Sequence, residues 1–195
     1  MIETAGVITT DDSDHVKRFK EGTESAFTEI VKLHQSRLMQ AAMILLQNEQ
    51  DAMDVVQDVF VKAYFNLHSF RGDSSLYTWL YRILYNQCIS FLRRKKIVSF
   101  LSFSSDEEDL DIPSNEPYPD ENIERSETMN AIMEALGKLP LRQRMVFTLK
   151  QLNNLKFSEI SKIMDITEGA AKASYFHAVK KLQKLLRHYG DEYGL

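Results

Sequence analysis

The sequence predicts an all-α protein in which two small helical domains are joined by a flexible acidic linker, the C-terminal domain containing a helix-turn-helix. Three observations favour this fold class. Apolar residues recur at three- and four-residue steps in both halves of the chain, as on one face of a helix. Seven glycines and four prolines are too few for the turns of an all-β fold. Between the halves, residues 99–126 hold three of the four prolines and show no periodic apolar face.

Composition excludes several classes of protein. A hydrophobic content of 44% is enough to build cores, which argues against a disordered chain. The single cysteine, Cys88, excludes an internal disulfide, and its neighbours at helical spacing are apolar, so we expect it buried. The N-terminus lacks the pattern of a signal peptide, and the longest apolar run, residues 41–46, is too short to span a bilayer. We therefore expect a cytoplasmic protein without membrane insertion.

Two helices are predicted in the first part of the chain. "TESAFTEIVKLHQSRLMQAAMILL" (23–46) carries an apolar stripe that includes His34, which we interpret as a packed core histidine. "NEQDAMDVVQDVFVKAYFNL" (48–67) offers Asn48 as the N-cap and Asp51 three residues later, similar to a capping box. One face of this second helix is apolar and the other is polar.

The next segment combines aromatic rings with positive charge. "SFRGDSS" (69–75) interrupts the helical pattern, with Gly72 for a turn and Ser74 or Ser75 as the next cap. A helix from about residue 76 to 96, roughly 30 Å long, is predicted to follow. It repeats tyrosine every four residues beside Arg82 and Asn86. Single-stranded nucleic acid favours such a face because bases stack on rings and phosphates attract cations, although a plain core helix has the same pattern.

The net charge is −4, but acidic and basic residues are strongly separated along the chain. Residues 71–96 carry six Lys/Arg against one acid, residues 101–124 carry nine acids and no base, and residues 138–189 carry eleven Lys/Arg against three acids. Two basic blocks on either side of an acidic connector indicate two separate surfaces for a polyanion. The alternative is that the basic residues only solvate helices.

The C-terminal segment "FSEISKIMDITEGAAKASYFHAVKKL" has the sequence pattern of a helix-turn-helix. Ser158 is predicted to cap a short helix, Asp165 to take a left-handed conformation at the turn, and Thr167 to cap the second helix. That second helix presents Phe176 and His177 outward, which suits a major groove where an aromatic edge contacts a thymine methyl group. An ordinary helical hairpin with an exposed aromatic residue is the alternative.

A family resemblance spans most of the chain, from about residue 14 to 187. "DAMDVVQDVFVKAYFNLHSFRGDSSLYTWLYRILYNQCISFLRRKK", the acidic linker and "LPLRQRMVFTLKQLNNLKFSEISKIMDITEGAAKASYFHAVKKL" follow in the order and spacing of one family. They resemble the extracytoplasmic-function (ECF) branch of bacterial RNA polymerase sigma factors. The most specific stretches are D-x-x-D-V-x-Q-D-x-F at Asp51–Phe60 and T-W-L-Y-R-I at Thr78–Ile83.

The resemblance implies a division into sigma regions. Residues 1–13 and 191–195 would be tails, 14–98 region 2, 99–126 the acidic linker and 127–190 region 4. Region 2 would bind core RNA polymerase and recognise and melt the −10 promoter element, whereas region 4 would read the −35 element as duplex DNA. The linker would thread the polymerase near the RNA exit path. Such a chain is an alternative sigma factor and not an enzyme.

The same resemblance assigns residues to each surface. Core polymerase would contact Asp51, Asp54, Val55, Gln57, Asp58 and Phe60. The −10 DNA would contact Arg71, Asp73, Ser74, Tyr77, Tyr81, Arg82 and Asn86. The −35 DNA would contact Thr167, Lys172, Ala173, Phe176, His177 and Lys180. Whether Tyr77, Tyr81 and Tyr85 face DNA or pack internally stays open, whereas Trp79 is expected in the core.

The chain departs from its relatives on the second helix of the helix-turn-helix, which would contact the −35 bases. Many of them carry Thr-Val before the basic residue and Ser-Arg after it, where this chain has Ala170-Ala171 and Ala173-Ser174. Fewer arginines mean fewer bidentate contacts to guanine, so the preferred −35 sequence is not transferable. Core polymerase, promoter DNA and a cognate anti-sigma factor are the expected partners, with no cofactor.

Two other classes of function compete with this interpretation. A free-standing DNA-binding regulator would use only the helix-turn-helix and would not need the aromatic and polar helices of the first half. An enzyme would need a catalytic arrangement or phosphate loop, and the sequence shows neither. Asp51, Asp54 and Asp58 share a helix face, but nothing completes a metal shell around them, so no metal site is predicted.

Overall fold

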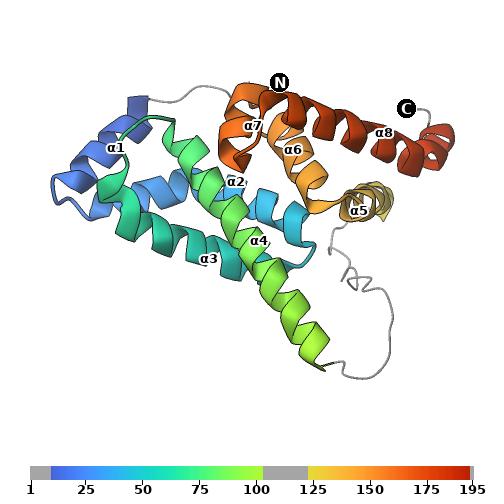
Figure 1. The fold of residues 1–195 in the computed structure, drawn as a ribbon, viewed down its shortest axis with the longest axis horizontal. Helices are drawn as coiled ribbons and strands as arrows, with labels where there is room; N and C mark the ends of the chain where they lie inside the picture. The colour runs from blue at the N-terminus through green and yellow to red at the C-terminus, as the bar shows by residue number, and fades with distance from the viewer. Residues whose placement is uncertain (1–9, 103–122, 194–195) are drawn as a thin grey trace.

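A computed structural model describes the backbone of residues 10–102 and 123–193, and the side chains of residues 12–96 and 128–187. Every regular element in these ranges is a helix, which confirms the all-α prediction (Figure 1). In chain order they are α1 (Thr10–Lys20), α2 (Ser25–Leu46), α3 (Glu49–Asn66), the 3-10 turn η1 (Leu67–Ser69), α4 (Leu76–Ser102), α5 (Ile123–Gly137), α6 (Leu141–Gln151), α7 (Phe157–Met164) and α8 (Glu168–Tyr193).

The helix signals of the first half are confirmed. Asn48 caps α3, where its side chain accepts a hydrogen bond of 2.9 Å from the Asp51 amide. Gly72 takes a φ of 81°, a conformation that glycine adopts without strain. Ser75 caps α4 by accepting from the Thr78 amide at 3.1 Å. The helix then runs to Ser102, past residue 99 where the linker was expected to begin.

Helices α1 to α4 form the first unit, in which α4 lies across α2 and α3 (Figure 1). Its core is aliphatic and includes Leu38, Leu45, Val59, Leu80 and Leu84, and Cys88 is buried in it as predicted. His34 is buried as well, with its Nε2 2.9 Å from Oδ1 of Asp12 on α1. This pair attaches α1 to α2.

Helices α5 to α8 form the second unit, whose α7 and α8 make the helix-turn-helix. Asp165 ends α7 with a φ of 53°, the left-handed turn that was predicted. Thr167 caps α8 by accepting from the Ala170 amide at 3.1 Å. The predicted cap of α7 was wrong, because α7 begins at Phe157 after Lys156 rather than after Ser158. There the Glu159 carboxylate accepts a hydrogen bond from the Lys156 amide, which caps the helix two residues earlier than predicted.

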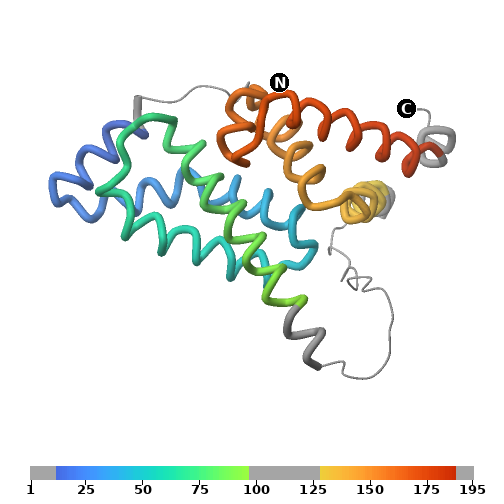
Figure 2. Tube along the Cα trace, viewed as in Figure 1, coloured from blue at the N-terminus to red at the C-terminus, as the bar shows by residue number. Residues whose placement is uncertain are grey.

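The two units pack against each other. Helix α4 contacts α7, and α2 contacts both α5 and α6, so the tube in Figure 2 shows the second unit lying along one side of the first. The apolar cores join at this boundary, since Ile44 of α2 packs with Leu136, Leu139 and Leu182. Residues 103–122 of the predicted linker lie outside the described residues. The two halves are therefore joined by side-chain packing as well as by the chain.

The described helices and side chains offer neither a membrane span nor a metal site. No helix there is long and apolar enough to cross a membrane. Likewise, the described side chains contain no group of three or more His, Cys, Asp or Glu placed to hold a metal ion.

Candidate nucleic-acid interface

The tyrosine row of α4 lies at the boundary between the two units. Tyr81 is 0% exposed, and its ring centroid lies 4.4 Å from that of Tyr77. Its hydroxyl donates to the Arg37 carbonyl at 3.1 Å and accepts from the Asn153 amide at 2.9 Å. Burial raises the pKa of Tyr77, Tyr81 and Tyr85. Tyr81 therefore packs internally and offers no surface to DNA, whereas Tyr77 and Tyr85 are half-buried.

A pocket of about 320 Å³ opens between α3 and α4. Trp79 and Ile83 form its apolar part, and it is lined in full by Lys62, Asn66, Ser69, Trp79, Ile83, Asn86 and Gln87. Lys62 Nζ donates to Gln87 Oε1 at 2.7 Å, and the Ser69 hydroxyl donates to the Asn66 carbonyl at 2.7 Å. Two apolar side chains beside several polar ones can contact both the face and the polar edge of a small ligand.

Only part of this pocket was predicted. Asn86 was assigned to −10 DNA, and Ser69 begins the segment 69–75 that was predicted to interrupt the helical pattern. Trp79, expected in the core, is half-buried and packs its ring 5.3 Å from that of Phe70. Ile83, Asn86 and Gln87 recur at helical spacing with Trp79, a second stripe that could have indicated the pocket. Nothing in the sequence around Lys62 and Asn66 of α3 indicated that these residues would line a pocket.

The other residues predicted for −10 DNA surround this region without lining the pocket. Arg71 and Asp73 are exposed on the loop before α4, and Arg82 is exposed on α4. Ser74 is half-buried, and its hydroxyl donates to the Ser75 carbonyl at 3.3 Å. The structure thus brings the loop close to the helix but separates Arg82 from the tyrosine row, which faces the second unit.

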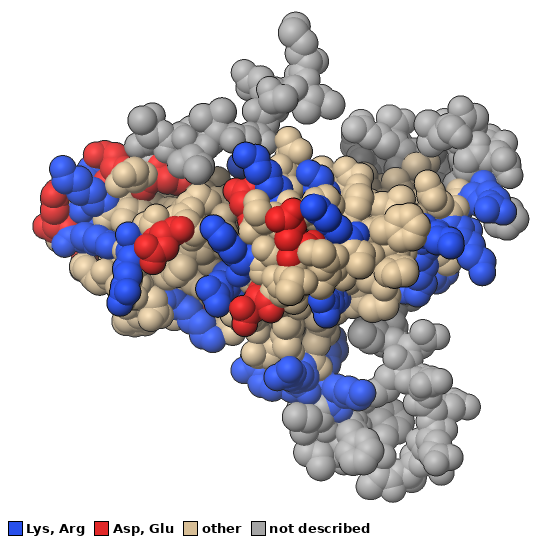
Figure 3. All heavy atoms as spheres, turned by 45° about the horizontal axis from the view of Figure 1, so that its top comes forward, with Lys and Arg blue, Asp and Glu red and all other residues tan. Residues whose placement is uncertain are grey.

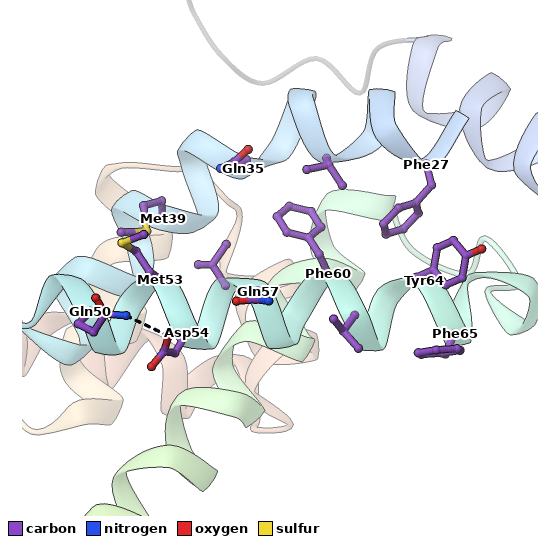
Figure 4. Close-up of a pocket in the computed structure, with 13 residues that line it drawn as sticks. Phe27, Gln35, Met39, Gln50, Met53, Asp54, Gln57, Phe60, Tyr64 and Phe65 are labelled. Atoms are coloured by element: carbon purple, nitrogen blue, oxygen red, sulfur yellow. Dashed lines mark hydrogen bonds between the residues drawn. The ribbon is translucent and has the colours of Figure 1, made fainter. Parts of the chain in front are cut away.

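An apolar groove of about 600 Å³ runs between α2 and α3 (Figure 4). Phe27, Phe60 and Tyr64 pack edge to face along it, and Phe65, at 75% exposure, lies at its rim. The full lining is Phe27, Val31, Gln35, Met39, Gln50, Met53, Asp54, Val56, Gln57, Phe60, Val61, Tyr64 and Phe65. Exposed aromatic and aliphatic side chains gathered in a groove mark a protein-binding surface.

Three of the residues predicted for polymerase binding line this groove. They are Asp54, Gln57 and Phe60, and the Asp54 carboxylate accepts from Gln50 at 3.2 Å (Figure 4). Asp58 is exposed beside the groove. Asp51 instead pairs with Lys95 of α4 at 2.7 Å. Val55 is 2% exposed and packs in the core, so its side chain does not face a partner.

The outer face of α8 is open to solvent. The six residues predicted for −35 DNA are all exposed: Thr167, Lys172, Ala173, Phe176, His177 and Lys180. Phe176 is 62% exposed, and its ring centroid lies 5.8 Å from that of His177. Lys172 pairs with Glu168 one turn earlier at 2.8 Å, an exposed ion pair that a phosphate can displace at little cost.

Lys and Arg are spread over the face shown in Figure 3, and two groups of them come from the basic blocks of the sequence. One group lies where α4 leaves the first unit, where Arg93, Arg94, Lys95 and Lys96 are exposed. The other lies along α8 in the second unit, where Lys180, Lys181, Lys184 and Arg187 are exposed. Both basic blocks of the sequence therefore contribute surface cations, with Arg144 as a buried exception.

Comparisons with known proteins agree with this architecture. Sigma-70 region 2 matches residues 30–97, and Sigma-70, region 4 matches residues 129–182. The ECF RNA polymerase sigma factor SigW of Bacillus subtilis is 32% identical over 177 residues, which cover 88% of this chain and 95% of SigW. The ECF RNA polymerase sigma-E factor of Escherichia coli K12 is 33% identical over 181 residues, covering 88% of this chain and 94% of that protein.

Solved structures share the fold. CnrH in complex with the cytosolic domain of CnrY gives a TM-score of 0.67 at 24% identity, over 92% of this chain and 99% of CnrH. The sigma factor RpoE of Bartonella quintana, in complex with the anti-sigma factor NepR, gives a TM-score of 0.67 at 25% identity, over 83% of this chain and 96% of RpoE.

Two helical units that match regions 2 and 4, in that order, define the class of protein: an RNA polymerase sigma factor. The identity to SigW and sigma-E over almost their full lengths gives the branch, and the chain belongs to the ECF family of sigma factors. It is an alternative sigma factor that acts in promoter-specific transcription initiation, and it is not an enzyme.

Proposed function

We propose that this sigma factor divides promoter recognition among three surfaces: the groove of α2 and α3 for core polymerase, the α3–α4 pocket for the −10 element, and the outer face of α8 for the −35 element. The observation that carries the proposal is the pocket, because a site for one planar group beside an exposed loop is what capture of an unpaired base requires. Residues 14–98 and 127–190 would serve as regions 2 and 4.

The groove suits a helical partner. Its apolar floor would accept an apolar ridge, while Asp54, Gln57 and Asp58 on its rim would supply polar contacts. By family resemblance the partner is the clamp-helix coiled coil of the largest polymerase subunit. Phe65 is the best candidate for a dominant contact, since aromatic residues that become buried carry much of the energy of protein interfaces.

The pocket suits a base extruded from the non-template strand. Unstacking a duplex step costs a few kcal/mol, and stacking of a captured base returns roughly 1–3 kcal/mol. Trp79 and Ile83 would supply the apolar contact, and Asn86 would supply hydrogen bonds to a base edge. Arg71 and Arg82 would neutralise the phosphates on either side.

The outer face of α8 suits the major groove. Phe176 would contact a thymine methyl group and His177 would donate to a base acceptor, whereas Lys172 and Lys180 would bind phosphates. Thr167 caps α8, so its hydroxyl would contact the DNA at the N-terminal end of the helix.

A cognate anti-sigma factor is the proposed regulatory partner, and the cytoplasm the proposed location. The likeness to RpoE, whose structure was solved with an anti-sigma factor, supports a partner of this kind.

In vitro transcription tests the proposal. Purified core polymerase is incubated with fragmented genomic DNA, with and without this protein, and the 5′ ends of the transcripts are mapped. We expect new discrete start sites that share two upstream boxes. No new transcripts, together with specific duplex binding by the protein alone, would identify a free-standing regulator instead.

A further inference from the structure

The C-terminal end of α1 contacts the chain just before α4, at the η1 turn. Phe19 is 4% exposed, and its ring centroid lies 5.0 Å from that of His68 in η1 and 5.3 Å from that of Tyr64 in α3. At the next position Lys20 Nζ donates a hydrogen bond to the Phe70 carbonyl, 50 residues later in the chain. Helix α1 therefore holds η1 by packing and the residue after η1 by a charged hydrogen bond.

Phe70 connects this contact to the α3–α4 pocket. Its amide donates to the Leu67 carbonyl at 3.1 Å, so both polar groups of its backbone have partners. Its ring centroid lies 5.3 Å from that of Trp79, which forms the apolar part of the pocket with Ile83. Ser69, the residue before it, lines the same pocket. A shift of the Phe70 backbone would therefore move one pocket residue directly and change the packing of another.

The segment between η1 and α4 is held at its two ends. Residues 71–73 are exposed, and Gly72 has a φ of 81°. Outside a helix or sheet, each residue of such a segment is fixed only by individual contacts. Lys20 supplies a contact at the start of the segment, and Ser75 caps α4 at its end by accepting from the Thr78 amide. Loss of the first contact would free the side of the segment next to the pocket.

Helix α1 is itself firmly attached to the first unit. Asp12 and His34 are both buried and lie 2.9 Å apart, and the ring centroids of Phe19 and Phe27 are 5.6 Å apart. Lys20, in contrast, is exposed, and only its ammonium group reaches the loop. Its replacement leaves no cavity in the core, so the hydrogen bond can be removed while the packing of α1 is kept.

We propose that Lys20 is a positioning residue for −10 recognition: its hydrogen bond sets the place of Phe70 and, through Phe70, that of Trp79 in the pocket. Lys20 does not line the pocket, so it acts through Phe70. The consequence at the promoter rests on the proposed function. The effect on Trp79 is measurable in the free chain without any promoter.

Trp79 is the single tryptophan of the chain, so its fluorescence reports this wall of the pocket. Lys20→Met removes the donor and keeps an unbranched side chain, and we expect the acrylamide quenching constant of Trp79 to rise about twofold. Lys20→Arg keeps a charged donor and should restore most of the wild-type value. Quenching of Lys20→Met equal to that of the wild type would overturn the proposal.

Lys17→Met is the matched control. Lys17 is exposed on the same helix and lies 4.0 Å from Glu21, so its replacement removes the same charge without touching the loop. It should give the quenching of the wild type, and far-ultraviolet circular dichroism of all the variants should match the wild type. A loss of helical signal in Lys20→Met, or equal quenching in the two methionine variants, would contradict a local role for Lys20.

Run-off transcription tests the consequence at the promoter. On templates with single substitutions in either box, Lys20→Met should lose about two- to tenfold discrimination at the −10 box and none at the −35 box, the range expected for one hydrogen bond. Lys20→Arg should keep the discrimination. If Lys20 instead bound a phosphate, Lys20→Met would weaken transcription from all templates by the same factor. Such a uniform loss would overturn the proposal.

A pocket variant separates failure of this proposal from failure of the proposed function. Asn86 lines the pocket, so Asn86→Ala should lose discrimination at the −10 box by direct contact. Loss in Asn86→Ala with none in Lys20→Met would overturn the role of Lys20 and leave the function of the pocket intact. No loss in either variant would overturn the function of the pocket, and the quenching of Trp79 would still decide whether Lys20 positions its wall.

Discussion

Replacing Arg144 with methionine should destabilise the protein by about 2–3 kcal/mol, because it removes the only side chain among the described residues that bonds the carbonyls of both α2 and the α5–α6 connection. Methionine is unbranched, fills much of the same volume and carries no charge. The change therefore isolates the guanidinium from the packing of its stem.

The magnitude follows from two opposing contributions. The bonds to Leu45 and Leu139, at 2.8 and 3.1 Å, are well formed, and a hydrogen bond from a charged group contributes about 1.5–3 kcal/mol. Burial opposes them, because it lowers the pKa of Arg144 to about 10, which corresponds to a cost of about 3 kcal/mol for keeping the charge. The two bonds together contribute about 3–6 kcal/mol, so subtracting this cost leaves a net loss of up to about 3 kcal/mol.

Urea unfolding monitored by circular dichroism measures the effect. Arg142→Met is the matched control, since Arg142 lies on the same helix but is exposed, and we expect a change within about 0.5 kcal/mol. In thermal scans the Arg144 variant should melt roughly 5–10 °C lower, given about 2–4 °C for each kcal/mol at this size. Equal stability of the two variants would refute the reasoning that the buried guanidinium joins the units.

Three further predictions concern separate parts of the molecule. Phe65→Glu should weaken core polymerase binding about tenfold or more in a fluorescence titration without lowering stability, because the ring is 75% exposed in the free chain; unchanged affinity would exclude the rim of the groove. Cys88 should resist thiol reagents at pH 8 until denaturant is added, since burial raises the pKa of its thiol to about 12; rapid reaction of the native protein would contradict this. The same shift predicts that Cys88 contributes to stability below pH 9 and that this contribution declines as the pH rises from about 9 towards 12, because only the unfolded thiol then ionises. Asn48→Ala should cost about 1 kcal/mol in urea unfolding by removing the cap of α3, whereas an effect near zero would mean that water replaces the cap.

Local features of the fold were predictable from the sequence. The cap at Asn48, the left-handed turn at Asp165 and the outward face around Phe176 each depend on residues within a few positions of one another. Such features follow from hydrogen bonding of the nearby backbone and from helical periodicity. The predicted cap at Ser158 failed because Glu159 offered a competing acceptor for the backbone.

Long-range features were not predictable in this way. Arg144 was counted with the basic surface, but it is buried because its partners lie on α2, about one hundred residues earlier. Tyr81 was assigned to DNA, and the residue that reaches its hydroxyl, Asn153, lies in the other unit. The α3–α4 pocket combines Lys62 with Gln87 across the crossing of two helices. Periodicity identifies the face of a helix that is apolar and not the segment that covers it.

Discrimination at the two promoter boxes, measured separately, tests the division of recognition most directly. Run-off transcription on matched templates that carry single substitutions in the −10 or the −35 box is compared among the wild-type chain, Asn86→Ala and Phe176→Ala. We expect Asn86→Ala to lose about tenfold discrimination at the −10 box only, and Phe176→Ala to lose a similar factor at the −35 box only, since one base contact contributes about 1–3 kcal/mol. Loss at both boxes in either variant, or at neither box in both, would contradict the assignment of the pocket and the α8 face to separate elements.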